Sequence, residues 1–482
     1  RFMDQKSPED MSRLVKCISR INKTNKSINA VISHYDFDTL LKQHNPNANE
    51  NDLIFLLKDN MCTKDLPTTC ASKALSGFVS PYDCTIVERI RANNGLILGK
   101  TNMDEFAMGT DNAYTTYGPV KNPLFADEYR TPGGSSGGAA ASVAAGYCDI
   151  ALGTDTGGST RLPSSFCSVF GFKPSYGRIS RYGVVSFAQS LDTVGIVANS
   201  MDNIEKSFKI LDAHDPKDPT CLTNEMRENF AKSAPTRKLR IGLIHEAILD
   251  YEPEVRKKWE ECLETLIEAG HEVVEVSVPT LKMSVPAYIA ISFSEATSNL
   301  ARYDGVRYGY RAVEDMDPVY RTLYGPTRNE GLGDEVQRRL LIGTFNLTEG
   351  AYDEHFLKAQ KVRRMLINDF NKVLRKPNML FPRANGPNTE NVEGIDVFVN
   401  PTSLGIAHVM GKKREDESVL EVLGDVLTIP CNLAGLPAIT VPVGKSIGME
   451  VYGQHGDDMT VLGLAREIDE IFKYKNKISE SV

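Results

Sequence analysis

Two serines and one lysine stand where their side chains could break an amide bond. Ser135 and Ser159 lie 24 positions apart (159 − 135) in a stretch rich in Gly, Ser and Thr, and each follows a glycine. Lys58 comes directly after the apolar run Leu53 to Leu57. A serine hydroxyl is a weak nucleophile unless a neighbouring base takes its proton. A lysine can be that base only when uncharged, and burial can lower its pKa by several units from about 10.4.

The glycine-rich stretch, residues 132–161, has three interpretations. Its glycines could form turns that serve packing only. They could aim backbone N–H groups at a phosphate. The same N–H groups could instead form an oxyanion hole beside a nucleophilic serine.

Two short motifs imitate other enzyme classes. A phosphate-binding loop requires four residues between its glycines before Lys-Ser/Thr, whereas the segment Gly95 to Thr101 has three. Gly134 to Gly138 fits the Gly-x-Ser-x-Gly elbow around Ser136, but that elbow requires a strand before it. The segment before it here, Asp127 to Pro132, is polar and ends in proline. Neither motif therefore predicts a function.

The histidines do not indicate a Ser-His-Asp triad. All eight lie outside residues 132–161. The fold could still bring one to a serine, but no histidine is marked for that role by its sequence context. Their ordinary interpretation is a surface or core position.

The composition is that of a globular protein, with 41% hydrophobic and 24% charged residues in 482. The net charge of −8 argues against strong non-specific nucleic-acid binding by this chain itself, but not against a nucleic acid held mainly by a partner. The nine cysteines form no Cys-x-x-Cys pair, which predicts free thiols and no zinc or other metal site. Apolar runs are too short for a membrane span. Because the sequence starts without Met, we expect a lost N-terminal piece such as a transit peptide.

Helical and strand patterns alternate along the chain, which favours an α/β fold. A strand at residues 239–244, a helix around residues 255–266 and a strand at 271–276 predict one βαβ unit. Other predicted elements are a helix and strand within residues 8–35, strands at 53–57 and 96–98, and helices at 86–90 and 139–145. Polar residues 44–49 predict a loop, and residues 376–394, rich in Pro, Gly and Asn, predict a surface insertion.

The Lys58, Ser135 and Ser159 pattern resembles the amidase signature family. This resemblance implies an amidase signature fold, with a large mixed central β-sheet covered by helices on both faces. It implies one domain over residues 1–482, with a core of about 50–200 and 420–465 and a middle lobe of about 200–420. Ser159 would attack the carbonyl, and Ser135, joined to Gly134 by a cis peptide bond, would relay protons to Lys58. Backbone N–H groups of Thr156, Gly157, Gly158 and Ser159 would form the oxyanion hole.

Further segments resemble the A subunits of glutamyl-tRNA(Gln) amidotransferases, over roughly residues 50–440. The longest is Gly99 to Gly109, and others are Thr68 to Lys73, Ser180 to Gly183, Arg302 to Gly309 and Leu427 to Pro430. In that family this component hydrolyses glutamine and passes ammonia to a partner. The resemblance implies a heterotrimer with the B subunit and a small C subunit or its functional replacement, and tRNA(Gln) held mostly by the partner. ATP and Mg²⁺ are expected on the partner, with no cofactor on this chain and no membrane association.

Free glutamine requires a cation for its carboxylate and an anion for its ammonium. Alignment with the family's glutamine pocket places Arg339, Asp425 and Tyr288 at these contacts. The choice of Arg339 over Arg338 rests on spacing alone. A solvated helix charge is the competing interpretation for the arginine, a surface carboxylate for Asp425 and a core aromatic for Tyr288.

Departures from bacterial members predict an organellar protein. The segment before Lys58 lacks the usual Gly- and Pro-containing lead-in, and the insertion at 376–394 is atypical. We therefore expect the mitochondrial matrix, with the cytoplasm as the alternative. Two other functions remain open: a stand-alone amidase acting on another small amide, and a non-catalytic scaffold component of an RNA-processing assembly.

Overall fold

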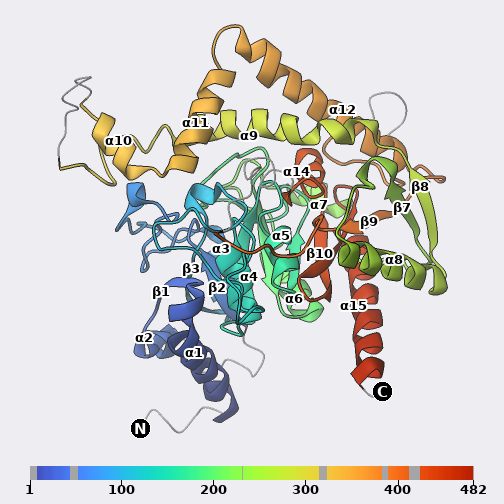
Figure 1. The fold of residues 1–482 in the computed structure, drawn as a ribbon, viewed down its shortest axis with the longest axis horizontal. Coiled ribbons are helices and arrows are strands. Elements are labelled where there is room, and N and C mark those ends of the chain that lie inside the picture. Colours follow the sequence, from blue (N-terminus) through green and yellow to red (C-terminus); the bar gives the residue numbers. More distant parts are fainter. Residues whose placement is uncertain are drawn as a thin grey trace.

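One eleven-stranded mixed sheet organises the chain (Figure 1). The computed structural model describes residues 8–43, 53–230, 232–313, 323–382, 389–411 and 424–480. The strand order is β1-β3-β2-β4-β6-β5-β10-β11-β9-β7-β8. The strands are β1 Val31–His34, β2 Ile54–Lys58, β3 Leu96–Thr101, β4 Ile150–Asp155, β5 Phe170–Lys173, β6 Thr193–Ala198, β7 Arg240–Ile244, β8 Glu272–Val276, β9 Val397–Pro401, β10 Ala438–Gly444 and β11 Ile447–Gly453.

Helices cover both faces of this sheet, as the resemblance predicted. Every residue of β2, β3, β4 and β6 is buried, which requires cover on each side. The helices are α1 Pro8–Ile28, α2 Phe37–Gln43, α3 Thr85–Ala92, α4 Gly137–Ala144, α5 Arg161–Phe166, α6 Met201–Leu211, α7 Asn224–Glu228, α8 Pro253–Glu268, α9 Ser284–Leu300, α10 Gly325–Gly331, α11 Asp334–Asn346, α12 Lys358–Val373, α14 Ile429–Ala434 and α15 Asp458–Glu480.

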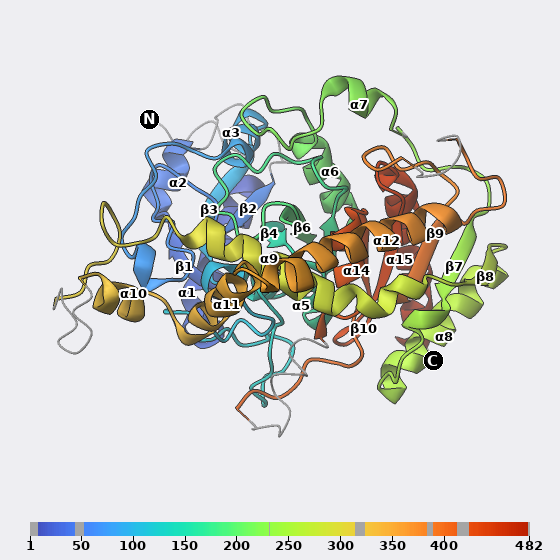
Figure 2. The same ribbon diagram turned by 90° about the horizontal axis from the view of Figure 1, so that it is seen from above.

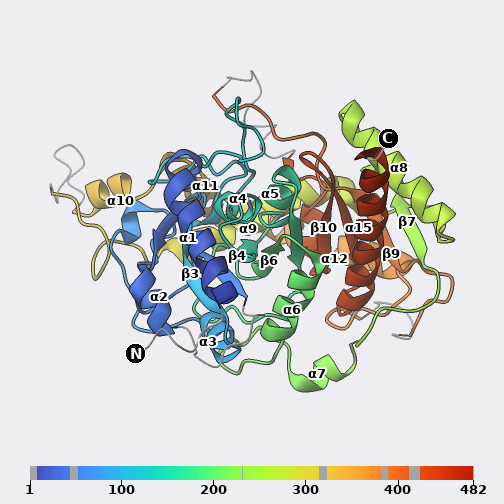
Figure 3. The same cartoon turned by 90° about the horizontal axis from the view of Figure 1, so that it is seen from below.

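Three long helices form a separate layer across one end of the molecule. Figures 1 and 2 show α9, α11 and α12 crossing over the sheet, whereas Figure 3 shows α1, α6 and α15 on the opposite side. The buried side of α11 packs against α9 and includes Val336 and Gly343. A Cβ at Gly343 would stand 2.0 Å from the Phe293 carbonyl oxygen, so the two helices touch closely there.

The predicted elements are confirmed in kind and differ mainly at their ends. Strands β7 and β8 pair in parallel and are joined by α8, as the βαβ prediction required. The small-residue helix predicted at 139–145 is α4. The predicted polar loop at 44–49 lies outside the described residues.

The predicted surface insertion at residues 376–394 stays a prediction, but its first residues are anchored to the rest of the fold. Asn378 is 1% exposed, and its amide donates to Gln454 Oε1 at 3.0 Å. Lys376 Nζ pairs with Asp457 at 2.5 Å. These polar side chains lie in a segment without helix or strand and bind residues just before α15, because buried polar groups need partners. Among the described residues, no helix is both long and apolar enough to cross a membrane.

Strands β2, β3 and β4 run parallel, which fixes where chemistry can occur. β2 pairs in parallel with both neighbours, so the carboxyl ends of all three strands reach the same edge. Lys58 ends β2, and Asp155 ends β4. The glycine-rich loop after β4 therefore begins beside the lysine, although about a hundred residues separate them in sequence (155 − 58 = 97).

A buried ion network anchors that loop. The Arg161 guanidinium donates to both Asp155 carboxylate oxygens at 2.8 and 2.9 Å, to Glu450 and to the Thr428 carbonyl at 3.0 Å. All three charged side chains are fully buried. Burial alone would raise the pKa of Asp155, but the Arg161 charge holds it at about 2. The network thereby joins the first residue of this loop, Asp155, to its last, Arg161.

Arg161→Leu is expected to lower the free energy of unfolding by about 3–5 kcal/mol, because Asp155 and Glu450 would remain buried without their cation. The midpoint of urea-induced unfolding measures this. Lys217→Ala is the matched control, since its pair with Glu88 is exposed. Equal midpoints for the two variants would contradict the assignment.

Candidate active site

Lys58 lies in the interior and contacts hydroxyl groups rather than a carboxylate. Its side chain is fully buried, and Nζ donates to Ser135 Oγ at 2.7 Å and to Ser136 Oγ at 2.8 Å. Burial lowers the pKa of Lys58 to about 7, against the opposing charges of Asp104, Asp155 and Asp192. A substantial fraction of the amine is therefore uncharged near neutral pH, the state in which it can accept a proton.

Ser136 is a residue whose contact with the lysine the sequence did not reveal. Its hydroxyl donates to the Thr154 carbonyl at 3.1 Å, so it accepts from Lys58. A neutral amine that gives one N–H to Ser136 keeps its lone pair for another group. Ser135 Oγ, 2.7 Å from Nζ, is close enough to donate to that lone pair once the amine is neutral. The predicted cis bond between Gly134 and Ser135 is confirmed. The adjacent Ser-Ser pair was the only signal available in the sequence.

Ser159 lies in the loop after β4, close to the segment that carries Ser135. Its carbonyl accepts from Ser136 N at 3.1 Å, which joins the two glycine-rich segments. Its side-chain hydroxyl makes no hydrogen bond to another described residue, and Ser159 is 7% exposed. The structure thus brings Lys58, Ser135 and Ser159 to one place and leaves the Ser159 hydroxyl available to a ligand.

The four predicted oxyanion-hole donors are also available. Within the described residues, the N–H groups of Thr156, Gly157, Gly158 and Ser159 donate no hydrogen bond. The Thr156 side chain is held by Asp192, which accepts from its hydroxyl at 2.6 Å. Unpaired N–H groups in a buried turn can stabilise a developing negative charge. Asp192 was not singled out in the sequence, because its partner is distant along the chain.

The two central glycines of this loop allow polar side chains to approach closely. A Cβ at Gly157 would stand 2.7 Å from the Tyr288 hydroxyl oxygen, and one at Gly158 would stand 2.7 Å from Asp425 Oδ1. Gly158 has φ of +144°, which side-chain-bearing residues rarely adopt. Tyr288 and Asp425 therefore lie directly against the loop that carries Ser159.

Asp425 is a buried carboxyl group without a direct partner for one oxygen. It is 7% exposed, and Oδ1 has no hydrogen-bond partner among the described residues. Burial raises the pKa of Asp425 to about 8, a rise that nearby Asp155 adds to and the charges of Arg161 and Arg339 oppose. A ligand cation placed here would favour the charged carboxylate.

Arg339 supplies the opposite charge from α11. Its Nε donates to Glu335 at 2.6 Å and its guanidinium lies 5.1 Å from the Phe293 ring centre, while Nη1 and Nη2 donate to no other described residue. Its charge acts on both Tyr288 and Asp425. Arg339 is 12% exposed at its side chain, whereas Arg338 is 49% exposed. The geometry thus brings Tyr288, Arg339 and Asp425 together and turns Arg338 toward solvent.

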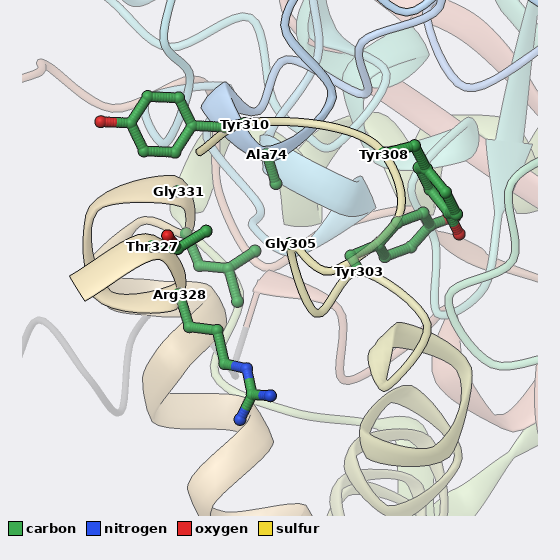
Figure 4. Close-up of a pocket in the computed structure, with 9 residues that line it drawn as sticks. Ala74, Tyr303, Gly305, Tyr308, Tyr310, Thr327, Arg328 and Gly331 are labelled. Atoms are coloured by element: carbon green, nitrogen blue, oxygen red, sulfur yellow. The ribbon is translucent and has the colours of Figure 1, made fainter. Parts of the chain in front are cut away.

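A small cavity elsewhere in the structure is lined by none of the site residues described above. Figure 4 shows it between Tyr303 and Tyr308 on one side and Thr327 and Arg328 on the other. Its volume is about 10 Å³, which suffices for about one water molecule. Within the part of the chain that the structure describes, no group of three or more His, Cys, Asp or Glu side chains could hold a metal ion.

A sequence profile of the amidase family matches residues 13–462. The chain is 44% identical over 457 residues to the mitochondrial glutamyl-tRNA(Gln) amidotransferase A subunit of Yarrowia lipolytica, covering 93% of this chain and 97% of that relative. It is 43% identical over 427 residues to the protein of the same name from Eremothecium gossypii, covering 86% and 90%. These likenesses confirm the resemblance inferred from the motifs.

Solved structures show the same relation. The glutamyl-tRNA(Gln) amidotransferase A subunit from Thermotoga maritima is 33% identical, with a TM-score of 0.74 over 95% of this chain and 91% of that one. A 6-aminohexanoate cyclic dimer hydrolase is 22% identical, with a TM-score of 0.76 over 96% and 93%. The second likeness concerns the fold alone.

The reactivity of Ser159 is expected to rise with pH through about 7, because only deprotonated Lys58 can take the serine proton. A fluorophosphonate probe measures this, since fluoride leaves phosphorus as Ser159 Oγ bonds to it. Lys58→Met should slow labelling by about 100-fold or more at every pH, and Ser159→Ala should abolish it. Labelling that is independent of pH between 6 and 9 would contradict the role of Lys58.

Proposed function

The chain belongs to the amidase family, and on that basis we propose that it is the glutamine-hydrolysing component of a glutamyl-tRNA(Gln) amidotransferase. The observation that carries this proposal is a carboxyl group and a guanidinium group beside the serine loop, which can bear opposite charges when a zwitterion binds. Asp425 lies against Gly158, and the charge of Arg339 acts on Asp425. A zwitterionic amino acid requires such a pair, whereas a neutral amide does not.

The glutamine substrate would lie with its ammonium at Asp425 and its carboxylate at Arg339. The two unused Arg339 amino groups can bind a carboxylate in a bidentate manner. The Tyr288 hydroxyl, which lies against Gly157, can add a contact. This arrangement directs the side-chain amide toward Ser159.

Acylation begins when Ser159 Oγ attacks the amide carbon. The Ser159 proton passes to Ser135, whose own proton passes to Lys58 along the 2.7 Å contact. The negative charge on the carbonyl oxygen is accepted by N–H groups of the loop from Thr156 to Ser159. As the C–N bond breaks, the Lys58 proton returns through Ser135 to the leaving nitrogen. Ammonia and a glutamyl ester of Ser159 result.

Deacylation reverses these roles. A water molecule attacks the ester carbon while Ser135 and Lys58 take up its proton, and the proton then returns to Ser159 as the C–O bond breaks. Glutamate leaves, and the enzyme returns to its initial state. The same buried amine therefore serves as base and acid in each half-reaction.

The ammonia would be passed to a partner chain that amidates Glu-tRNA(Gln). That step consumes ATP with Mg²⁺, both on the partner, which we identify as the B subunit together with a small third component. The transfer RNA would be held mainly by the partner, as the net charge of −8 also favours. The mitochondrial names of the curated relatives support the mitochondrial matrix as the compartment.

Arg339→Ala is expected to raise KM for glutamine about 10- to 100-fold with a smaller change in kcat, because a charge-assisted contact to the carboxylate is lost. Steady-state glutaminase kinetics measure this on the chain purified with its native partners. Arg338→Ala is the matched control and should leave KM within about twofold. A stand-alone amidase would hydrolyse hydrophobic amides well and would be indifferent to Arg339→Ala.

Ser159→Ala is expected to abolish glutamine-dependent formation of Gln-tRNA(Gln), while added ammonium chloride restores it, because ammonia is the product handed on. The amount of Gln-tRNA(Gln) formed by the purified complex measures both reactions. A scaffold role predicts that Ser159→Ala retains the glutamine-dependent reaction. That result would reject catalysis by this chain.

A further inference from the structure

Two adjacent carboxylates, Asp104 and Glu105, follow the carboxyl end of β3. They contact two different parts of the site: the segment that carries Ser135, and the start of α11, the helix that carries Arg339. The mechanism above uses neither of them. Both are buried, with Asp104 fully so and Glu105 4% exposed. Consecutive buried carboxylates are costly unless each has specific partners. Their partners belong to different parts of the site.

Asp104 contacts the segment that carries Ser135. Its backbone N–H donates to the Ser135 carbonyl at 3.2 Å. Its carboxylate accepts from Asn112 N at 2.9 Å and from Tyr114 N at 3.0 Å. A Cβ at Gly134 would stand 2.2 Å from Asp104 Oδ2, so the carboxylate lies directly against the Gly134–Ser135 peptide.

Asp104 also acts on Lys58 through its charge. The charged or titratable groups that act on Lys58 are Asp104, Asp155, Asp192 and Cys70, and Asp104 is the largest of these influences. The charge of Asp155 is compensated by its ion pair with Arg161, and Asp192 accepts a hydrogen bond from Thr156. Asp104 in turn is acted on by Asp111 and Lys58, and burial raises the pKa of Asp104 to about 7.

Glu105 contacts the start of the helix that carries Arg339. Its Oε2 accepts from Gly333 N at 2.9 Å, the residue that precedes α11. Its Oε1 accepts from Ser72 Oγ at 2.5 Å. A Cβ at Gly333 would stand 2.4 Å from Glu105 Oε2, so the carboxylate lies directly against this residue. A carboxylate at a helix N-terminus is also favoured by the helix dipole.

The backbone that directly follows these two residues is strained. Phe106 and Ala107 have φ of 50° and 64°, a region that residues with a Cβ rarely adopt. Such strain persists where the surroundings hold it and often marks functional sites. Here the strained residues directly follow the two carboxylates, whose partners Asn112 and Gly333 are far apart in sequence.

We propose that Asp104 and Glu105 are positioning residues that hold the two halves of the active site in register. Asp104 holds Ser135 and sets the electrostatic environment of Lys58, whereas Glu105 holds the start of α11 and thereby places Arg339 for the substrate carboxylate. The Glu105 half of this inference rests on the proposed function, because it assumes an amino-acid substrate. The Asp104 half requires only the serine and lysine chemistry.

Asp104→Asn tests the first half. Asp104 carries its negative charge mainly above about pH 7, because burial raises the pKa of Asp104 to about 7. Loss of that charge disfavours protonated Lys58, so the acid limb of the pH profile should move to lower pH. The maximal rate should fall at least about tenfold, because an amide has one carbonyl oxygen for two backbone donors. Both are read from fluorophosphonate labelling of the full chain with its partners. The fraction of chain labelled at completion corrects for misfolded protein, and an unshifted limb would overturn the Asp104 assignment.

Glu105→Gln tests the second half by comparing two substrates. Glutamine carries the carboxylate, whereas 4-aminobutanamide lacks it and retains the amine and the amide. KM for glutamine should rise about fivefold or more, while KM for 4-aminobutanamide and the labelling rate stay within about twofold. Asp334→Asn, an exposed carboxylate in the first turn of α11, is the matched control and should change neither KM. Equal changes for both substrates would overturn the Glu105 assignment.

Failure of the proposed function gives a different result. In that case the wild-type complex hydrolyses 4-aminobutanamide as well as glutamine or better, and the Glu105 assignment falls with the function. The labelling profile of Asp104→Asn still supports or overturns the Asp104 assignment, because it requires no glutamine.

Discussion

The free-energy cost of burying a charged amine is the constraint on which this site depends. No carboxylate of the described residues is in direct contact with Lys58, and its hydrogen bonds go to two hydroxyls. In such surroundings the neutral amine competes with the charged one near pH 7. A contacting carboxylate would stabilise the charged amine and make the lysine a poorer base. The nearby carboxylates are instead satisfied by other partners, as Asp155 is by Arg161 and Asp192 by Thr156.

The parallel arrangement of three strands brings the buried lysine and the other site residues to the same edge of the sheet. Lys58 ends β2, Asp104 and Glu105 follow β3, and the loop of Ser159 follows β4. Because β3, β2 and β4 are adjacent and parallel, their carboxyl ends open on one edge, the usual location of ligand sites in such sheets. Base, positioning carboxylates and nucleophile therefore come from three separate segments of sequence that the sheet places side by side.

The sequence was sufficient to predict the helices and strands, and those site residues whose signal lies within a few neighbouring positions. An apolar run ending in Lys58, paired Gly-Ser steps and small-residue helix α4 are all readable because each signal spans a few residues. The roles of four other residues could not be predicted for the opposite reason: Ser136, Asp104, Asp192 and Glu105. Their roles depend on partners that are distant in sequence. Thr156 binds Asp192 from 36 positions away, and Gly333 binds Glu105 from 228 positions away. The burial of Asn378 escaped prediction for the same reason, since a polar residue predicts an exposed position until its partner Gln454 is known.

The choice between Arg338 and Arg339 shows what the tertiary structure adds. Both arginines follow Glu335 on one helix and both contact its carboxylate, so residue type does not separate them, and the sequence offered spacing alone as a reason to choose Arg339. Helical geometry turns successive residues by about 100°, and only one of the two can face α9. Packing of Val336 and Gly343 against that helix decides the rotation, and it directs Arg339 toward Tyr288. The specificity of the site thus depends on helix packing as much as on the charged residues themselves.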